Sequence, residues 1–548
     1  MAELKVTFSN APGVKSRSDA MAIGGALEGA DSFDRETALW NPSFRTPDQI
    51  INTVKDTADA RSRDSARNDG YISGGASVWK DSIVGSQFRL NANPNFTLLS
   101  TYAKGFDEVW ADEFQQVVEA RFSLLADSND CWLDASRTNT LTGMVRLAVG
   151  VFLMTGEIIS TAEWIREVAR PYNTCLQFVR SDRLCNPNGQ SDQIDLRRGV
   201  QKDSNGKAVG FYFRKGDRFN SYPGSPSYVW DYVNARKPWG RKMVLHIIEQ
   251  QDYDQSRGVS QMVAVLKNIR MTKKFREITL QSAVINATYA AAIESELPQD
   301  VMQAVIGSTT SSSPIAGMAS VYGGYLGALS SYLSDANNIR VDGATIPHLF
   351  PGTKMKLQNA GTPGGVGTSF EESLLRHTAA ALDVSYESLS RDFSKTNYSS
   401  GRMAMAVQGQ AMASKKKHVA DRYASDIYAL QLEEMIAAGD VPLPRGVKRD
   451  AFYLPLAKDA MCRCNWIGSG AGQIDELKET QAATMRINAG ISTHEIENGR
   501  LGLDWREVAQ QRARERKLFE SLGLPTFLDI TKPAPLTGGD NTNPQGSN

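Results

Sequence analysis

Two helical segments joined by a short polar break, between Phe370 and Ala437, limit what this chain can fold into more than any other feature. Before the break, apolar residues recur at three- and four-residue spacing, which places one apolar stripe along a helix. After it, the run from Ser400 to Ala438 is rich in helix formers and has no proline, enough for about ten turns. Ser399 or Ser400 is expected to be the N-cap. The sequence therefore predicts one very long helix that starts at a polar loop.

The break itself, SRDFSKTNYSSGR, carries basic and hydrogen-bonding side chains but no nucleophile beside a base. From Arg391 to Arg422 there are seven Lys or Arg and two Asp, a local net charge of +5 in a chain whose net charge is zero. For Arg391, Lys395 and Arg402, contact with phosphates and an ordinary surface loop are both open interpretations. The neutral total argues against a protein that coats nucleic acid non-specifically, so any contact with DNA is expected to be local.

The whole chain has an ordinary soluble composition. Its 548 residues predict two to four structural units, and 41% hydrophobic with 22% charged residues is typical of a globular protein. The longest apolar run, Leu147 to Met154, is far too short to span a membrane. The start, MAELKVTFSNAPG, has no basic region followed by an apolar core, so no secretory signal is predicted and a cytoplasmic protein is expected. Five cysteines fit a reducing compartment, and their spacing predicts no metal site.

Segments with a helical sequence pattern alternate with segments with a β-rich pattern along the chain, which predicts an α+β fold. Helices are expected at 54–68, 105–126, 141–154, 260–295 and within 474–522, and short strands between 158 and 248, with a hairpin after Asn205. Glycines at 70, 74 and 75 are expected to interrupt the first helix before a β-leaning run to Leu90. A small unit at 298–367, with a helix near 322–333 and strands at NNIRV and KMKLQN, lies between two helices that both lead to it. That is the layout of a small cap on a two-helix stalk.

Motifs that would indicate an enzyme are incomplete. The glycine-rich GTPGGVGTS before the second helix lacks the Gly-Lys-Ser/Thr order of a nucleotide loop, so a hinge is favoured. His494-Glu495 begins like a zinc-protease motif, but Asn498 stands where the second histidine must be. Lys415, Lys416 and Lys417 are interpreted as a solvated face or inter-subunit contact in preference to a phosphate patch. No enzyme, metal or cofactor is predicted.

Several blocks in one order resemble the lambda family of bacteriophage portal proteins. The blocks are RNDGYISGGASVWKDSIVGSQFRL at 67–90, DQSRGVSQMVAVLKNI at 254–269, ATYAAAIESEL at 287–297, SFEESLLRHTAAALDVSYESLSRDFSKTNYSSGRMA at 369–404 and NWIGSGAGQIDELKE at 465–479. One departure is Asp383, which stands where the family pattern has a glycine. The first fifty residues, the segment 298–340 and the tail carry none of the resemblance.

The resemblance implies an α+β portal fold with named regions. These are a flexible N-terminal arm (1–53), a wing of helices and a β-rich module (54–255), a first stem helix (256–296), a small α/β clip (297–367), a second stem helix (368–390), a tunnel loop (391–401), a tunnel helix and wing return (402–465), a helical crown (466–525) and a disordered tail (526–548).

It also implies a function. Members form a dodecameric ring at one capsid vertex, through which double-stranded DNA is packaged and ejected. The implied partners are other copies, DNA without sequence preference, the terminase large subunit, major capsid and scaffold proteins, and head-completion or tail adaptor proteins, with no membrane. The implied location is the virion, with the host cytoplasm during assembly. The alternatives are a scaffold or capsid-lining protein without a channel, and a DNA-processing motor subunit.

Two sets of site residues follow from the resemblance. The tunnel loop implies DNA-facing side chains at Arg391, Lys395, Asn397, Tyr398, Ser399 and Arg402. The clip implies a terminase- or adaptor-facing set at Ile346, His348, Lys354 and Lys356.

Overall fold

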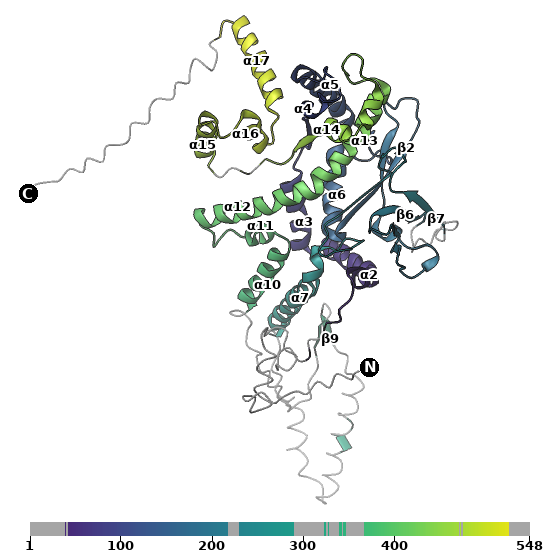
Figure 1. The fold of residues 1–548 in the computed structure, drawn as a ribbon. Helices are drawn as coiled ribbons and strands as arrows, with labels where there is room; N and C mark the ends of the chain where they lie inside the picture. Colours follow the sequence, from purple (N-terminus) through teal and green to yellow (C-terminus); the bar gives the residue numbers. More distant parts are fainter. Residues whose placement is uncertain are drawn as a thin grey trace, which may run out of the picture.

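One helix runs across the molecule and the other elements are arranged around it (Figure 1). It consists of α12 (Tyr398–Lys415), a π-helical stretch η5 (Lys416–Asp421) and α13 (Arg422–Ala438). A computed structural model describes residues 42–216, 229–289, 367–470 and 475–524, residues 39 and 472, and short stretches between 323 and 346. The long helix predicted from Ser400 to Ala438 is confirmed, and the π-helical stretch inside it was not foreseen.

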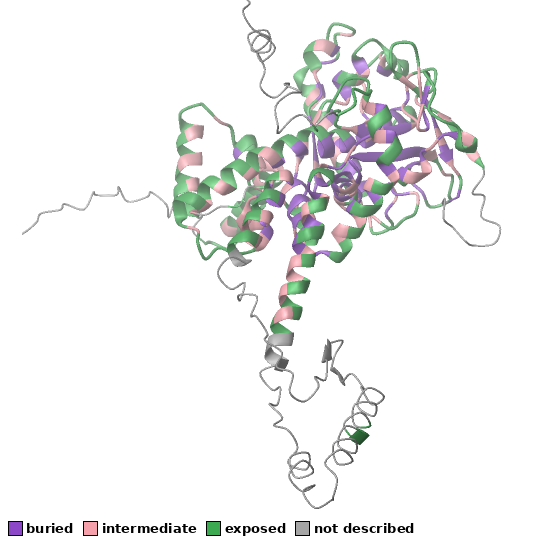
Figure 2. Cartoon of the chain, turned by 90° about the horizontal axis from the view of Figure 1, so that it is seen from below, coloured by how far each residue is buried: buried purple, intermediate pink, exposed green. Residues whose placement is uncertain are grey.

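Helices from the first third of the chain pack beside the long helix, with α3 against α12, α6 against η5 and α5 against α13. They are α2 (Pro47–Asn68), α3 (Gly70–Ile83), α4 (Phe96–Leu99), α5 (Glu108–Ala126) and α6 (Leu141–Thr155). Figure 2 shows the buried residues gathered in this body and the exposed ones on the projecting helices. In the core, the ring of Phe122 on α5 meets that of Tyr428 on α13 edge to face at 5.6 Å. Tyr423 and Ile427 of α13 are also fully buried, so the far half of the long helix is a core element.

The expected end of the helix at Asn68 is confirmed, since Asp69 is extended, but the β-leaning run expected after it is wrong, because residues 70–83 form the helix α3. Asp69 is its N-cap and accepts hydrogen bonds from the amides of Tyr71 and Ile72. The glycines are tolerated because α3 buries Trp79 and Ile83, and because Gly75 lets the helix approach Leu389 closely. Tertiary burial therefore outweighs the low helix propensity of these glycines.

The described residues form four antiparallel sheets, three of which belong to the body of the molecule. One has the order β3-β2-β8, from β3 (Thr174–Phe178), β2 (Glu157–Trp164) and β8 (Val244–Ile248). A second runs β4 (Leu196–Arg197), β5 (Val200–Lys202), β6 (Ala208–Arg214) and β7 (Trp230–Asn234), and its β5-β6 pair is the hairpin expected after Asn205. The 3-10 turns η2 (Ser181–Arg183) and η3 (Pro187–Gly189) lie between the two sheets in sequence.

The third sheet joins β1 (Arg89–Ala92) to β11 (Cys464–Ile467). The sequence patterns predicted no strand at β11, because this strand depends on a partner far away in sequence, with Leu90 opposite Trp466. The indole of Trp466 stacks on Phe88 at 5.3 Å and donates to Oγ of Ser425 at 2.9 Å. The mixed α+β class is confirmed.

Two helices run side by side away from the body (Figure 1). They are α7 (Leu266–Tyr289), which follows the 3-10 turn η4 (Gln261–Val265), and α10 (Gly367–Ala381). Asn268 meets His377 at 3.0 Å, and Phe275, seven residues later on α7, meets Phe370, seven residues earlier on α10, with ring centroids 5.9 Å apart. The pair is therefore antiparallel, and both helices lead toward the segment between them. Within that segment the structure describes the hairpin strands β9 (Ile339–Val341) and β10 (Ala344–Ile346).

A buried ionic cluster links the segment that precedes α7 to the β3-β2-β8 sheet. Glu157 at the start of β2 accepts from Arg257 at 2.6 and 3.0 Å and lies 3.5 Å from Nζ of Lys55. His246 of β8 is 3.2 Å from the same carboxylate. Burial alone would raise the pKa of Glu157, but Arg257 and Lys55 hold it well below its usual range. The carboxylate is therefore ionised in the folded protein.

The C-terminal elements are the 3-10 turn η6 (Arg449–Tyr453), then α14 (Ala457–Met461), α15 (Glu476–Asn488), α16 (His494–Arg500) and α17 (Trp505–Ser521). The helix-rich prediction for 474–522 is confirmed. Among the described residues, no helix is long and apolar enough to cross a membrane.

Candidate functional site

The polar break lies at the free end of α12, between that helix and α11 (Tyr386–Ser390). The chain leaves α11 through Arg391, whose φ of 59° is left-handed. The amide of Ser394 then donates to Oδ1 of Asp392 at 2.9 Å, and the amide of Thr396 donates to the carbonyl of Phe393 at 3.1 Å. These local bonds give the loop a defined turn geometry.

Asn397, and neither Ser399 nor Ser400, is the N-cap of α12. Its Oδ1 accepts from the amide of Ser400 at 2.8 Å, and Oγ of Ser400 accepts from the amide of Asn397 at 3.1 Å. This reciprocal capping box satisfies two backbone groups at the start of the helix. The N-cap expectation was wrong by two or three residues because any of several polar residues in TNYSS can cap. The amide oxygen of Asn397 thus has a structural role at this site.

Lys395 forms an ion pair across the loop with α10. Its Nζ lies 2.5 Å from Oε1 of Glu372, and Oε2 of the same carboxylate lies 3.4 Å from the guanidinium of Arg376. The hydrogen bond to Glu372 raises the pKa of Lys395. Lys395 nevertheless remains 69% exposed, so its charge is available at the surface while the pair positions the loop on the stalk.

Two aromatic side chains, Phe393 and Tyr398, are exposed at the loop together with polar ones. Arg391, Tyr398 and Ser399 are all exposed, as the sequence analysis requires of contact residues. Phe393 is also exposed but was absent from the predicted set. Its apolar side chain within an otherwise polar break was the available signal.

Arg402 belongs to a different place from the rest of the predicted set. It lines a cavity of about 310 Å³ between α12 and the helices α15 and α16, together with Asp475, Lys478, Glu497 and Arg500. Glu497 accepts from Arg486 at 2.9 and 2.7 Å, and these bonds lower its pKa to about 2. The cavity therefore has fixed charges on its α16 wall and Arg402 on its α12 wall.

The segment after β11 follows one face of α12. A Cβ at Gly468 would come within 3.1 Å of Cε of Lys416, and a Cβ at Gly472 within 3.3 Å of Cε of Met405. Arg402 then faces the cavity with α15. Residues 402, 405 and 416 share one helix face at 3.6 residues per turn. We call this face the crown seat, because the C-terminal helices are attached along it.

The three adjacent lysines are not an open phosphate patch. Nζ of Lys415 lies 2.7 Å from Glu249, and Nζ of Lys416 donates to the carbonyl of Trp466 and to Asp421, both at 2.7 Å. Lys417 is exposed, as expected of a solvated face. The π-helical stretch that begins at Lys416 is thus linked to the strand that leads to the crown seat, and π-helical turns are frequent at functional sites.

The predicted clip set is mostly outside the described residues. Ile346 is in β10, opposite Ile339, and His348, Lys354 and Lys356 lie outside. The predicted strand KMKLQN and most of the predicted helix near 322–333 lie outside as well. Asp383, at the family's glycine position, has a φ of 55°, so the turn keeps the left-handed conformation with an aspartate.

The described part of the chain contains no group of side chains that would form a metal site. No three His, Cys, Asp or Glu residues there are grouped to hold an ion.

Comparison with known proteins decides the family. Residues 33–415 match the family described as phage portal protein, lambda family. The chain is 34% identical over 497 residues to the portal protein of Escherichia phage N15 and equally to portal protein B of Escherichia phage lambda, covering 90% of each chain in both cases. The chain belongs to the lambda family of phage portal proteins. Portal proteins are structural components of the virion and not enzymes, as the sequence analysis expected.

Solved structures align with this portal chain only weakly. The neck of an empty GTA particle is 13% identical with a TM-score of 0.38, covering 81% of this chain and 93% of that one. The virion of a native gene transfer agent particle is 15% identical with a TM-score of 0.32, covering 78% and 98%.

Proposed function

We propose that twelve copies of this portal protein form a ring at one capsid vertex and that double-stranded DNA passes through its channel during packaging and ejection. The observation that carries the proposal is the match to portal proteins over 90% of the chain. In this ring the free end of α12 faces the axis, and Figure 1 shows this end projecting away from the body that α13 helps to form.

The chemistry of the loop suits a conduit. Arg391, Lys395, Tyr398 and Ser399 are exposed, and a ring repeats each of them in every subunit. A few charges per subunit are enough for phosphate contacts without base reading. A strongly basic channel would hold DNA, because each neutralised phosphate adds salt-sensitive affinity. A chain that is neutral overall, with a small positive charge near the loop, is consistent with DNA passing through the channel without being held there.

The remaining regions take the roles that the family resemblance implies. The α7–α10 pair is the stem, the segment 297–367 is the clip, the sheets and surrounding helices are the wing, and α15 to α17 form the crown. The clip, with Ile346, His348, Lys354 and Lys356, docks the terminase large subunit and then head-completion or tail adaptors. Capsid and scaffold proteins surround the ring during assembly in the host cytoplasm.

Native mass spectrometry and negative-stain imaging of the purified chain test the ring. We expect a closed ring with a central opening. A chain that stays monomeric or dimeric under all assembly conditions contradicts the proposal.

The DNA-facing loop has a separate test. Replacing Arg391 and Lys395 together by Ala removes two cations from every subunit, and we expect fewer particles that retain full-length DNA, with a smaller deficit at higher salt, where these cations contribute less in the wild type. Glu372→Gln is the matched control, because it breaks the Lys395 ion pair and leaves the lysine charged. If Glu372→Gln reproduces the defect, Lys395 acts by positioning the loop; unchanged packaging in the double variant removes both residues from the DNA-contact set.

A further inference from the structure

One carboxylate of α10 pairs with the lysine of the polar loop. Oε1 of Glu372 lies 2.5 Å from Nζ of Lys395, and its Oε2 lies 3.4 Å from the guanidinium of Arg376, one turn along the same helix. The neighbouring Glu371 faces elsewhere, 3.5 Å from Arg276 of α7. Glu372 therefore compensates the charge of Lys395 in the single subunit.

The loop has a defined shape without this ion pair. Oδ1 of Asp392 accepts from the amide of Ser394 at 2.9 Å, and the capping box at the start of α12 fixes the other end of the loop. On the α11 side, Oε1 of Gln408 on α12 accepts from the amide of Ser385 at 3.0 Å. Bonds to the backbone thus hold both ends of the loop, and the ion pair is free to form and break.

The two partners of the pair differ in how far they can move. The side chain of Lys395 is 69% exposed, whereas that of Glu372 is 22% exposed and lies between two cations. A lysine carries its charge on a flexible four-carbon stem, so its ammonium can exchange one oxygen partner for another while the backbone stays in place. Exposed ion pairs are also weak. Lys395 can therefore leave Glu372 for another anion that comes to the loop.

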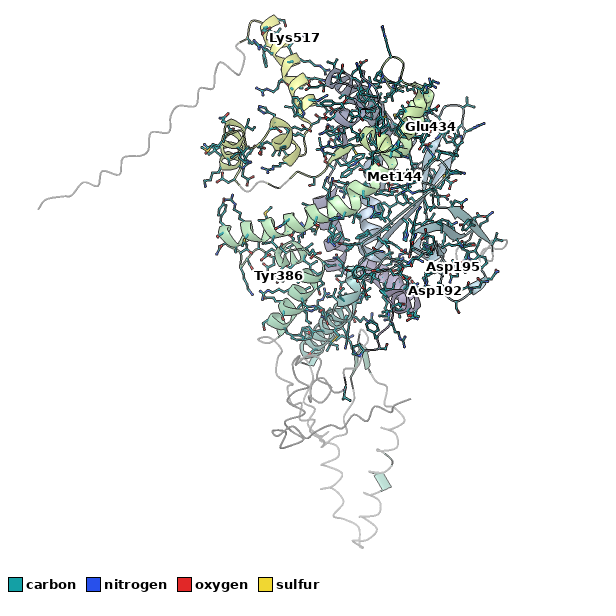
Figure 3. All side chains as sticks on the ribbon, viewed as in Figure 1. Met144, Asp192, Asp195, Tyr386, Glu434 and Lys517 are labelled. Carbon is teal, nitrogen blue, oxygen red and sulfur yellow. The ribbon has the colours of Figure 1, made fainter. Side chains whose placement is uncertain are left out.

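The position of the pair places it beside the free end of the long helix. The guanidinium of Arg376, the second cation at Glu372, lies 5.1 Å from the ring of Tyr386 at the start of α11. Figure 3 shows Tyr386 on the side of the molecule where α12 ends, opposite Glu434 of α13. In the proposed ring this side faces the axis, so the anion that comes to the loop is a phosphate of the DNA backbone.

Carboxylate and phosphate oxygens accept charge-assisted hydrogen bonds from an ammonium in the same way. A phosphate must therefore displace Glu372 before it binds Lys395, and Glu372 pairs with the lysine again when the phosphate moves on. This exchange shortens each contact but keeps the positive charge at the loop. Passage of DNA benefits, because every phosphate neutralised adds a salt-sensitive attraction that would hold it.

We propose that Glu372 competes with DNA phosphate for Lys395 and so limits how tightly the loop holds DNA in the channel. The inference rests on the proposed function, because the ring is what brings DNA to the loop. It assigns to a residue of α10, outside the loop, a role in setting the affinity of the loop for DNA.

The test measures two properties of the full-length chain. One is the affinity of purified rings for a short fluorescent DNA duplex over a range of salt concentrations. The other is the rate of DNA release from particles, with each variant supplied in trans to the phage whose own portal gene is inactivated. Glu372→Gln removes the competing charge and nearly keeps the shape of the side chain, and its combination with Lys395→Ala removes both partners.

Glu167→Gln is the matched control. Glu167 is exposed between β2 and β3 and forms an ion pair with Arg137, so this change removes the same charge and frees a cation away from the loop. We expect Glu372→Gln to bind the duplex about five- to tenfold more tightly at low salt and to release DNA more slowly. Its affinity should fall more steeply with salt, by up to about 0.9 in the log–log slope for each lysine engaged. The double variant should lose the gain, and Glu167→Gln should match the wild type.

Unchanged affinity and release in Glu372→Gln overturn the inference, and so does an equal gain in Glu167→Gln. A gain that persists in the double variant also overturns it, because the effect then comes from Arg376 or from the lost negative charge. Weaker binding by Glu372→Gln would show that the ion pair positions the loop and does not compete with DNA. A wild-type chain that forms no ring contradicts the proposed function itself, which is a distinct result.

Discussion

Glu157 is a buried carboxylate surrounded by buried cations, so at the scale of single residues it has the largest predictable effect on stability. Glu157→Gln keeps the shape but leaves the buried guanidinium of Arg257 without the carboxylate that it pairs with, while Lys55 keeps Asp59 at 2.9 Å. Breaking one partner of such a buried pair is expected to cost about 3–5 kcal/mol of unfolding free energy. Urea unfolding followed by circular dichroism measures this.

Glu520→Gln is the matched control for that change. Glu520 pairs with Arg516 on the exposed surface of α17, and exposed pairs of this kind contribute less than about 1 kcal/mol. A loss for Glu157→Gln no larger than that of Glu520→Gln would show that the buried cluster is dispensable for the fold.

Glu119 gives the protein a pH dependence of opposite sign to that of an ion-paired carboxylate. Burial raises its pKa from 4.5 to about 7, against hydrogen bonds from Gln115 and the amide of Ala92. The stability contributed by the protonated group is complete below the unfolded pKa near 4.5 and is lost as the pH rises through about 7. Glu119→Gln should remove about 1–3 kcal/mol of the decline between pH 5 and pH 8.

Urea midpoints at the two pH values for wild type and Glu119→Gln check this prediction. Glu113→Gln, on the exposed side of the same helix, should follow the wild type. Parallel declines in wild type and Glu119→Gln would assign the pH effect to other groups.

At the scale of elements, the sequence predicted long periodic helices well and local detail less well. The helices at 108–126, 141–155 and 398–438 have strong patterns of their own, and these patterns agree with the structure. Helix α3 and strand β11 were missed because distant partners stabilise them: Leu382 and Leu389 against Gly75, and β1 beside β11. The propensity of a segment depends on its own residues and does not indicate such distant partners.

The candidate site also combines features that follow from the local sequence with features that depend on distant parts of the chain. The loop at 391–397 and its exposed basic residues follow from the polar break, whereas the position of Arg402 on the crown seat depends on where the chain returns some 70 residues later. The roles of Lys415 and Lys416 likewise depend on Glu249 and Trp466. Charge patterns predict exposure on a helix, but they do not reveal a partner from another part of the chain.

Adjacent lysines provide a test of the link between the long helix and the crown seat. Lys416→Met keeps the aliphatic stem but removes the donor to Trp466 and Asp421, while Lys417→Met changes an exposed residue next to it. A charge-assisted hydrogen bond contributes about 1.5–3 kcal/mol. Losing it makes local opening easier by that amount, which raises the rate of amide exchange by a factor of about ten or more. Hydrogen exchange should accelerate in residues 464–470 of Lys416→Met and remain at the wild-type rate in Lys417→Met. Equal exchange in both variants would contradict the link.

At the scale of the whole molecule, the core and the C-terminal helices differ in how they are stabilised. In the part of the chain that the structure describes, no residue of α15 or α17 is buried, and apolar side chains such as Leu477, Met485 and Leu518 are exposed. Polar contacts join the C-terminal helices to the body, among them Arg506 of α17 with Asp112, and Glu495 of α16 with Asn91 at 2.6 Å. Their apolar surface is thus available to neighbours in a ring.

Removing residues 471–548 should therefore affect assembly far more than folding. Among the described residues, the body loses mainly exposed ion pairs and hydrogen bonds, so its unfolding free energy should fall by less than about 2 kcal/mol. The ring should be weakened much more, because each subunit loses exposed leucine and methionine side chains that neighbours would bury. Urea unfolding and native mass spectrometry at matched protein concentrations measure the two effects. An unfolded body, or a shortened chain whose rings match the wild type in stability, would show that the crown belongs to the core and not to the subunit interface.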